Sequence, residues 1–135
     1  MEKIIKFYKS FNRYSCFTDE SIYNETIECY NLQQFKVFKD SLGIYGFVTW
    51  AYLDNENLQY YLKTGIIDNY NCGNNLIHID LLAKKNIKEI YKWSRKHLAE
   101  KIGIGNKTQW IRLNKENGIR NIVNKTIKDS WLWVQ

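Results

Sequence analysis

The sequence has no proline, few cysteines and no long apolar run. Because proline is absent, tight turns must depend on glycine, asparagine and aspartate. Residues 1–6 lack the long apolar core of a signal peptide, and no stretch approaches the length of a membrane-spanning helix. We therefore expect a cytoplasmic protein without a membrane span.

Residues that could bind a metal ion are also scarce. Cys16, Cys29 and Cys72 are odd in number and far apart, with no paired spacing suited to zinc. We expect small buried residues or ordinary thiols at these positions. The two histidines, His78 and His97, have no paired cysteines or carboxylate pattern near them and predict no metal site. His97 lies among basic residues, so we expect it at the surface.

The chain has the size and composition of one folded domain. Its 135 residues, of which 44% are hydrophobic and 16% aromatic, are enough to bury a core and argue against disorder. We predict a single domain over residues 1–135, because the chain is too short for two.

Positive charge is concentrated in the C-terminal part of the chain. The net charge is +6, yet residues 1–40 hold six basic and six acidic residues, and residues 41–83 hold one basic and four acidic residues. Residues 84–135 hold thirteen basic and four acidic residues. Such a field favours an acidic partner, namely nucleic acid, a membrane surface or an acidic carrier protein.

Hydrophobic periodicity predicts an α+β order of helices and strands. Thr18 and Asp54 are good helix N-caps, and Gly103 is a helix terminator. The predicted helices cover residues 2–14, 18–30, 54–66 and 86–101. The predicted strands, in an antiparallel-rich mixed sheet flanked by these helices, cover residues 34–39, 44–53, 76–83 and 108–113. We expect a weaker helical or irregular segment at residues 117–128, and a short final strand that contains Trp131 and Trp133.

Residues 72–83 combine a turn with a strand that carries two polar side chains. Cys72-Gly73-Asn74-Asn75 has turn composition, and apolar residues alternate after it. A period of two places His78 and Asp80 on the same face of the sheet. An aspartate between leucines is partly desolvated unless a pocket or partner accepts it. The alternative is a half-exposed strand whose two polar residues face water.

A series of short motifs follows in one order along residues 44–120. The motifs are Thr49-Trp50-Ala51, Glu56-Asn57, Tyr61-Leu62, Cys72-Gly73, Ile79-Asp80, Leu82-Ala83, Ile90-Tyr91-Lys92-Trp93-Ser94-Arg95-Lys96 and Ile111-Arg112-Leu113. In this order, and at near-constant spacing, they resemble the toxin-activating lysine acyltransferases, the hemolysin-activating proteins that are co-expressed with RTX toxins. The resemblance implies a fold similar to that of the Gcn5-type acetyltransferases.

The resemblance also implies an activity, the transfer of a fatty acyl group from acyl carrier protein to a lysine of a protein substrate. The family is understood to use an aspartate of this strand, matched here by Asp80, together with a histidine from the N-terminal region. No histidine precedes His78 in this sequence. Ungapped extension places Tyr14 at the position of that histidine, and small gaps place Cys16 or Asp19 there.

Three hypotheses follow for the chemistry of the site. In the first, Asp80 raises the basicity of His78 or orients its imidazole, which serves as the general base. In the second, Cys16 or Tyr14 supplies a different nucleophile or acid. In the third, catalysis is absent and the scaffold binds or inhibits a protein partner. For His78 alone, the alternative is a satisfied and partly buried strand histidine.

We expect acyl carrier protein as the donor and no tightly bound cofactor. Coenzyme A would need a glycine-rich loop that opens a helix, but residues 83–86 contain no glycine. Gly103-Ile104-Gly105 lies at a predicted helix end, which is the wrong context. The basic residues that could contact the acidic carrier and its phosphopantetheine phosphate are Lys84, Lys85, Lys88, Lys92, Arg95, Lys96 and Arg112.

Two alternatives remain for this basic surface. It could be a solvated face that keeps the protein in solution. It could also bind nucleic acid, which the sequence favours less, because the interleaved aromatic residues fall at core-facing positions and form no stacking platform. The sequence is also compatible with a homodimer.

Overall fold

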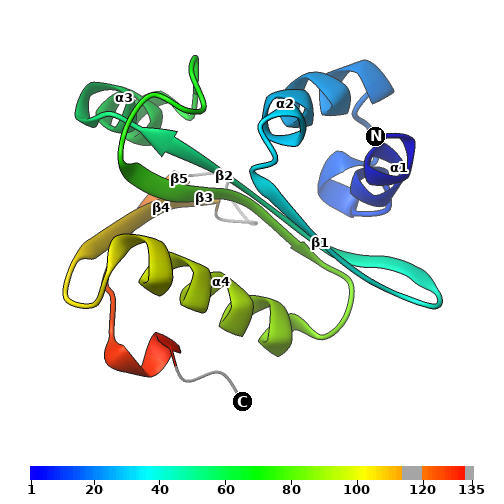
Figure 1. Ribbon diagram of the computed structural model, residues 1–135. Coiled ribbons are helices and arrows are strands. Elements are labelled where there is room, and N and C mark those ends of the chain that lie inside the picture. Colours follow the sequence, from blue (N-terminus) through cyan, green and yellow to red (C-terminus); the bar gives the residue numbers. More distant parts are fainter. Residues whose placement is uncertain (114–119, 133–135) are drawn as a thin grey trace.

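A three-stranded antiparallel sheet lies at the centre of the protein (Figure 1). The computed structural model describes residues 1–113 and 120–132. The sheet has the order β1 (Phe35–Asp40), β2 (Gly43–Leu53) and β3 (Asn75–Ala83), and both neighbouring pairs are antiparallel. In the turn between β1 and β2, the Leu42 amide donates a hydrogen bond to Asp40 Oδ1. The two strands therefore form a hairpin.

Helices cover both faces of this sheet (Figure 1). α1 (Glu2–Lys9), the 3-10 turn η1 (Asn12–Tyr14) and α2 (Asp19–Asn31) lie on one face, which we call the N-terminal face. α4 (Ile87–Ile102) crosses the opposite face, which we call the α4 face. α3 (Asn55–Thr64) follows β2 and packs against it.

Local capping signals define several helix ends. The Thr18 hydroxyl accepts a hydrogen bond from the Ser21 amide, and Asp54 Oδ1 accepts one from the Asn57 amide. These contacts satisfy amides that have no partner within the helix. Gly103 ends α4 with a φ of 98°, which glycine adopts without strain. The predicted starts of α2 and α3 and the predicted end of α4 are therefore confirmed.

Two further strands form a second antiparallel pair. β4 (Lys107–Leu113) pairs with β5 (Arg120–Thr126), and β4 lies beside β3. Among the described residues, no hydrogen-bonded ladder joins the two sheets. The prediction of a helical or irregular segment is wrong for residues 120–126, because pairing with β4 supplies partners that the local sequence does not reveal. Residues 117–119 lie outside the described residues.

The C-terminal segment packs against α4. η2 (Asp129–Leu132) is a 3-10 turn, and the Arg95 guanidinium lies 5.9 Å from the centre of the Trp131 ring. The predicted final strand is therefore wrong at Trp131, because this ring covers α4 instead of extending a sheet. Trp133 lies outside the described residues.

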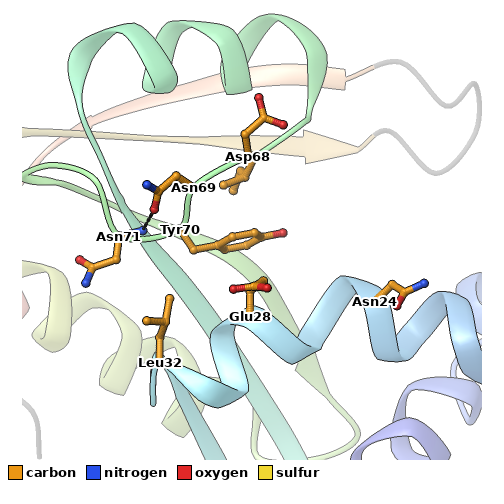
Figure 2. Close-up of a pocket in the computed structure, with 8 residues that line it drawn as sticks. Asn24, Glu28, Leu32, Asp68, Asn69, Tyr70 and Asn71 are labelled. Atoms are coloured by element: carbon orange, nitrogen blue, oxygen red, sulfur yellow. Dashed lines mark hydrogen bonds between the residues drawn. The ribbon is translucent and has the colours of Figure 1, made fainter.

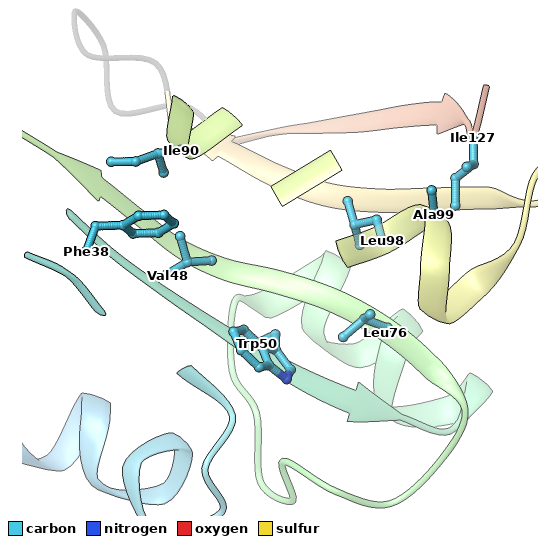
Figure 3. Packing of buried hydrophobic residues seen from close by; sticks show 8 residues of the cluster. All are labelled: Phe38, Val48, Trp50, Leu76, Ile90, Leu98, Ala99 and Ile127. Carbon is cyan, nitrogen blue, oxygen red and sulfur yellow. The ribbon is translucent and has the colours of Figure 1, made fainter. Parts of the chain in front are cut away.

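Hydrophobic clusters fill the space on both faces of the central sheet. The cluster under α4 (Figure 3) contains Phe38, Val48, Trp50, Leu76, Ile90, Leu98, Ala99 and Ile127. The cluster on the N-terminal face contains Ile4, Phe7, Tyr8, Tyr14, Ile22, Phe47 and Leu82. This arrangement confirms the α+β class. In the part of the chain that the structure describes, no helix is long and apolar enough to cross a membrane.

Candidate active site

A β-bulge in β3 determines which side chains face which helices. His78 pairs with Trp50 and Leu81 pairs with Val48, so three steps along β3 oppose two steps along β2. An extra residue of this kind interrupts the alternation of side chains. Asp80 therefore faces α1 on the N-terminal face, whereas His78 faces α4. The expectation that the two share a face is wrong, because a period of two does not hold across a bulge.

Asp80 is buried beneath α1 and makes two hydrogen bonds. The Tyr8 hydroxyl donates to Asp80 Oδ2 at 2.9 Å, and the Asp80 amide donates to Thr49 Oγ1 at 3.2 Å. Burial raises the pKa of the Asp80 carboxyl, whereas the hydrogen bond from Tyr8 and the charge of Arg13 oppose this shift. The Asp80 carboxylate is therefore a stronger base than that of an exposed aspartate.

Tyr14, the last residue of η1, lies beside Asp80. Its ring packs edge-on against Tyr8, with the ring centres 5.1 Å apart, and the Arg13 guanidinium lies 5.1 Å from the centre of the Tyr14 ring. The Tyr14 hydroxyl is buried and stabilises the Asp80 charge, but it makes no hydrogen bond of standard geometry to a described residue. Burial, and then the Asp80 charge, raise the pKa of Tyr14 well above its usual value. The phenol therefore stays protonated.

Of the three residues that could occupy the position of an N-terminal histidine, Tyr14 is the one that lies at Asp80. Cys16 is exposed, and Asp19 forms an exposed ion pair with Lys9 at 2.8 Å. Tyr14, the residue that ungapped extension places at the histidine position, is therefore the one that lies beside Asp80 in the fold. The hypothesis of a nucleophilic Cys16 has no geometric support.

Glu25 on α2 is a candidate that the sequence reasoning missed. It is half-buried, three residues after Ile22 and four before Cys29, both of which are fully buried. Burial, and then the charge of Asp80, raise the pKa of Glu25 to about 7, and Arg13 opposes this shift. A signal was available in the sequence, because i, i+3 and i+4 spacing places this carboxyl beside the apolar stripe of the helix.

An acidic groove opens next to this cluster, between α2 and the segment before β3 (Figure 2). It encloses about 590 Å³. Glu28 and Asp68 contribute carboxylates, asparagines supply much of the remaining lining, and none of the described lysines or arginines lines it. The Tyr70 ring also lines the groove. Burial, and then the charges of Cys29 and Asp80, raise the pKa of Tyr70 to about 12.

The α4 face holds a second buried polar cluster. His78 Nδ1 lies 2.6 Å from Ser94 Oγ, and His78 Nε2 lies 2.9 Å from His97 Nδ1. Both imidazoles pack against Trp93, and the His97 ring centre lies 4.4 Å from that of Trp50. The expectation of a surface position for His97 is wrong, because helical spacing brings it inward one turn after Trp93.

Both imidazoles in this cluster are neutral at pH 7. Burial, and then the neighbouring His97, lower the pKa of His78 to about 3. Burial, and then the charge of Lys101, lower the pKa of His97 to about 4. Because His78 points away from Asp80, the geometry does not support it as the base that acts with Asp80.

The predicted carrier-binding residues come from the segment after β3, from α4 and from β4. Lys84 Nζ donates to the Ser10 carbonyl at 2.6 Å and lies over the Phe11 ring, and Lys85 pairs with Asp40 at 2.6 Å. These two lysines thus connect the end of β3 to neighbouring segments of the same chain. The other predicted basic residues are exposed on α4 and β4, and they are Lys88, Lys92, Arg95, Lys96 and Arg112.

The described residues contain no group of three or more histidine, cysteine, aspartate or glutamate side chains that could hold a metal ion. The three cysteines are free, and only Cys29 is fully buried, where its thiol donates to the Trp50 carbonyl at 3.4 Å.

Comparison with known proteins places this geometry in a family. No curated protein matches the chain significantly. The model of the RTX toxin acyltransferase family matches residues 3–126, which is most of the chain, so the protein belongs to the RTX toxin acyltransferase family.

Proposed function

We propose that this protein transfers a fatty acyl group from acyl carrier protein to a lysine of a toxin. Family membership gives an acyltransferase that acts on toxins. That acyl carrier protein is the donor and that a lysine is acylated are proposals that go beyond family membership. The observation that supports it best is the buried Asp80 carboxyl with Tyr14 beside it, at the position expected for a catalytic partner.

The reaction sets two requirements for the site. The lysine amine must attack the carbonyl carbon of a thioester, so that a C–N bond forms, the C–S bond breaks and the phosphopantetheine sulfur leaves as a thiol. A proton acceptor is needed because the lysine ammonium has an ordinary pKa of about 10.4. A hydrogen-bond donor is needed for the oxyanion of the tetrahedral intermediate.

Tyr14 fits the role of the donor. Its phenol stays protonated, so it donates a hydrogen bond and does not act as a base. Its hydroxyl is also free of a standard hydrogen bond to a described residue, whereas the Tyr8 hydroxyl is engaged by Asp80. This favours the second hypothesis from the sequence, with Tyr14 as an acid. Its hydroxyl donates a hydrogen bond to the oxyanion.

Asp80 supplies negative charge at the point where the amine reacts. A buried carboxylate stabilises a neighbouring positive charge more strongly than an exposed one does, because solvent screens it less. We propose that Asp80 stabilises the positive charge that develops on the amine nitrogen as the C–N bond forms. The hydrogen bond from Tyr8 fixes the orientation of this carboxylate.

The exposed side of α4 is the proposed docking site for the carrier protein. Lys88 and Lys92 are exposed there, and Ile87 and Tyr91, at 48% and 49% exposure, lie beside them. An apolar centre flanked by positive charge suits an acidic helix of a carrier protein. The proposed docking site is centred on these four residues, because Lys84 and Lys85 already contact other segments of the chain.

The test is a transfer assay with acyl carrier protein charged with a fatty acid and a purified RTX toxin, read by mass spectrometry of toxin lysines. The wild-type protein should acylate lysine, and Asp80→Asn should lose most of kcat while keeping its fold. Charge reversal at Lys88 and Lys92 should raise KM for the carrier with little change in kcat. Reversal of the exposed Lys3 and Lys6 on α1 is the matched control and should leave KM unchanged.

A non-catalytic toxin-binding protein is the second candidate function. One observation favours it, namely that both histidines lie on the α4 face, away from Asp80. A wild-type protein that binds the toxin but leaves every lysine unmodified would establish this second candidate and exclude the first. Acylation that survives Asp80→Asn unchanged would also contradict the proposed role of Asp80.

A further inference from the structure

The N-terminal face offers few groups that can accept a proton from a lysine ammonium. Tyr8 and Tyr14 stay protonated, because burial raises the pKa of both phenols far above neutrality. Burial also raises the pKa of the Cys29 thiol to about 12, so this thiol stays protonated as well. Within the described chain, the carboxylates of Asp80 and Glu25 are the remaining acceptors in this cluster.

Of these two carboxylates, Glu25 lies between the buried cluster and the acidic groove. Residues three apart on a helix differ in direction by about 60°. Ile22, three residues before Glu25, points into the core, and Glu28, three residues after it, lines the groove. Glu25 therefore projects midway between the core and the groove. Asp80 lies deeper, beneath Tyr8.

We propose that Glu25 is the general base of the reaction and takes the place of the absent N-terminal histidine. The inference rests on the proposed lysine acyl transfer. The ammonium gives one proton to Glu25, which passes it to solvent, and the N–H electron pair stays on nitrogen as the attacking lone pair. When the tetrahedral adduct collapses, nitrogen loses a second proton to the departing thiolate, which leaves as the thiol.

The charges around Glu25 suit a base that works near neutral pH. The carboxylate of Asp80 disfavours ionisation of Glu25, whereas the Arg13 guanidinium favours it. The groups that interact electrostatically with Glu25 come from β3, α1, η1 and the segment before β3, and they are Asp80, Tyr8, Arg13, Tyr14 and Tyr70. Glu28 and Cys29 lie on the same helix. A base that is partly ionised near neutrality can both accept a proton and release it.

Two further observations point to a ligand at this position. The groove carries the carboxylates of Glu28 and Asp68 with no described cation in its lining, so it attracts an ammonium group (Figure 2). At the inner side, the buried Tyr14 hydroxyl makes no standard hydrogen bond to a described residue. Its contact with the Asp80 carboxylate falls short of standard geometry, so the hydroxyl is available to a polar group of a ligand.

The test compares Glu25→Gln with Glu20→Gln, an exposed position of the same helix, in the transfer assay across pH 5.5 to 9.5. Glutamine keeps the size of the side chain and removes the base. For Glu25→Gln we expect kcat at pH 7 to fall by about 100-fold or more, which is the usual contribution of a general base. The loss should shrink as pH rises, because more of the lysine is already deprotonated. Glu20→Gln should keep kcat within about twofold, because Glu20 is exposed and lies outside the groove.

A titration of the carboxyl groups by carbon-13 NMR adds a measurement that does not depend on activity. Glu25 should titrate near neutral pH in the wild type and at lower pH in Asp80→Asn, because the Asp80 charge is removed. If the wild type transfers acyl groups but Glu25→Gln retains both rate and pH profile, the assignment of Glu25 is wrong and the proposed function stands. If the wild type modifies no lysine, the proposed function itself fails.

Discussion

The two faces of the central sheet bury polar groups of opposite type. On the N-terminal face, burial raises the pKa values of the carboxyls of Asp80 and Glu25. On the α4 face, burial lowers the pKa values of His78 and His97. The same physical cause, desolvation, thus disfavours the charged form on both sides.

The two faces differ in whether the buried polar groups of each cluster have hydrogen-bond partners within the cluster. On the α4 face, both ring nitrogens of His78 have partners, and aromatic rings pack around them. On the N-terminal face, the Tyr14 hydroxyl lacks a standard hydrogen bond to a described residue, and a groove adjoins the cluster. A satisfied cluster stabilises a fold, whereas an unsatisfied one beside a groove is suited to a substrate.

The largest expected effect is a loss of stability caused by a substitution on the α4 face alone. Trp50→Ala removes a buried ring from the cluster under α4 (Figure 3) and should lower the free energy of unfolding by about 3–5 kcal/mol. Because the imidazoles lose their cover, their pKa values should also rise toward 6.5. Denaturant unfolding and proton NMR titration measure the two effects.

Phe47→Ala is the matched control for this prediction. Phe47 is buried, as Trp50 is, but packs on Tyr8 at the N-terminal face. It should destabilise the protein by a similar amount and leave the histidine pKa values unchanged. Equal histidine shifts in both variants would show that the two faces are not independent.

The next effect concerns pH and has opposite signs on the two faces. The pKa of His78 is about 3 in the folded protein and 6.5 in the reference state, so its stabilising contribution is complete above pH 6.5 and is lost as pH falls. The loss reaches at most about 1.4 kcal/mol per pH unit. Glu25, with its pKa raised from 4.5 to about 7, contributes most below pH 4.5 and loses this contribution as pH rises to 7.

The two trends therefore oppose each other between pH 4.5 and 6.5. Glu25→Gln should make the loss of stability on acidification steeper, because the opposing group is gone. His97→Asn, which keeps a hydrogen-bonding group for His78, should make the loss shallower. Unfolding in urea at several pH values measures the slopes, and the same slope in all three proteins would contradict the assigned protonation states.

The sequence predicted the elements but not the orientation of the site. The caps Thr18 and Asp54 are local signals, because each depends only on residues within the first turn of its own helix. The bulge that separates His78 from Asp80 arises from pairing with β2, and pairing is not visible within one strand. The raised pKa of Glu25 was missed because it depends on burial in the folded chain and on Asp80, which lies 55 residues away in the sequence.

A smaller effect is expected at two glycines, one of which lies close to backbone atoms and the other close to a side chain. A Cβ at Gly73 would lie 2.2 Å from the Asp54 amide nitrogen, so Gly73→Ala must displace the backbone. A Cβ at Gly46 would lie 2.4 Å from Ile90 Cδ1, the end of a side chain that can rotate. We expect about 2–3 kcal/mol of destabilisation for Gly73→Ala and less for Gly46→Ala. Urea unfolding measures both, and the reverse order would contradict this account.

The smallest effect sharpens the role of the Asp80 hydrogen bond. Tyr8→Phe keeps the ring but removes the hydroxyl that donates to Asp80, and should lower the free energy of unfolding by about 1 kcal/mol. The pKa of Asp80 should rise further, because this hydrogen bond favours the carboxylate. Tyr45→Phe is the control, since its hydroxyl donates to Glu89 at the exposed surface and should have no measurable effect on stability. If Tyr8→Phe leaves both stability and the Asp80 titration unchanged, Tyr8 does not orient Asp80, and the difference between the faces then depends on burial alone.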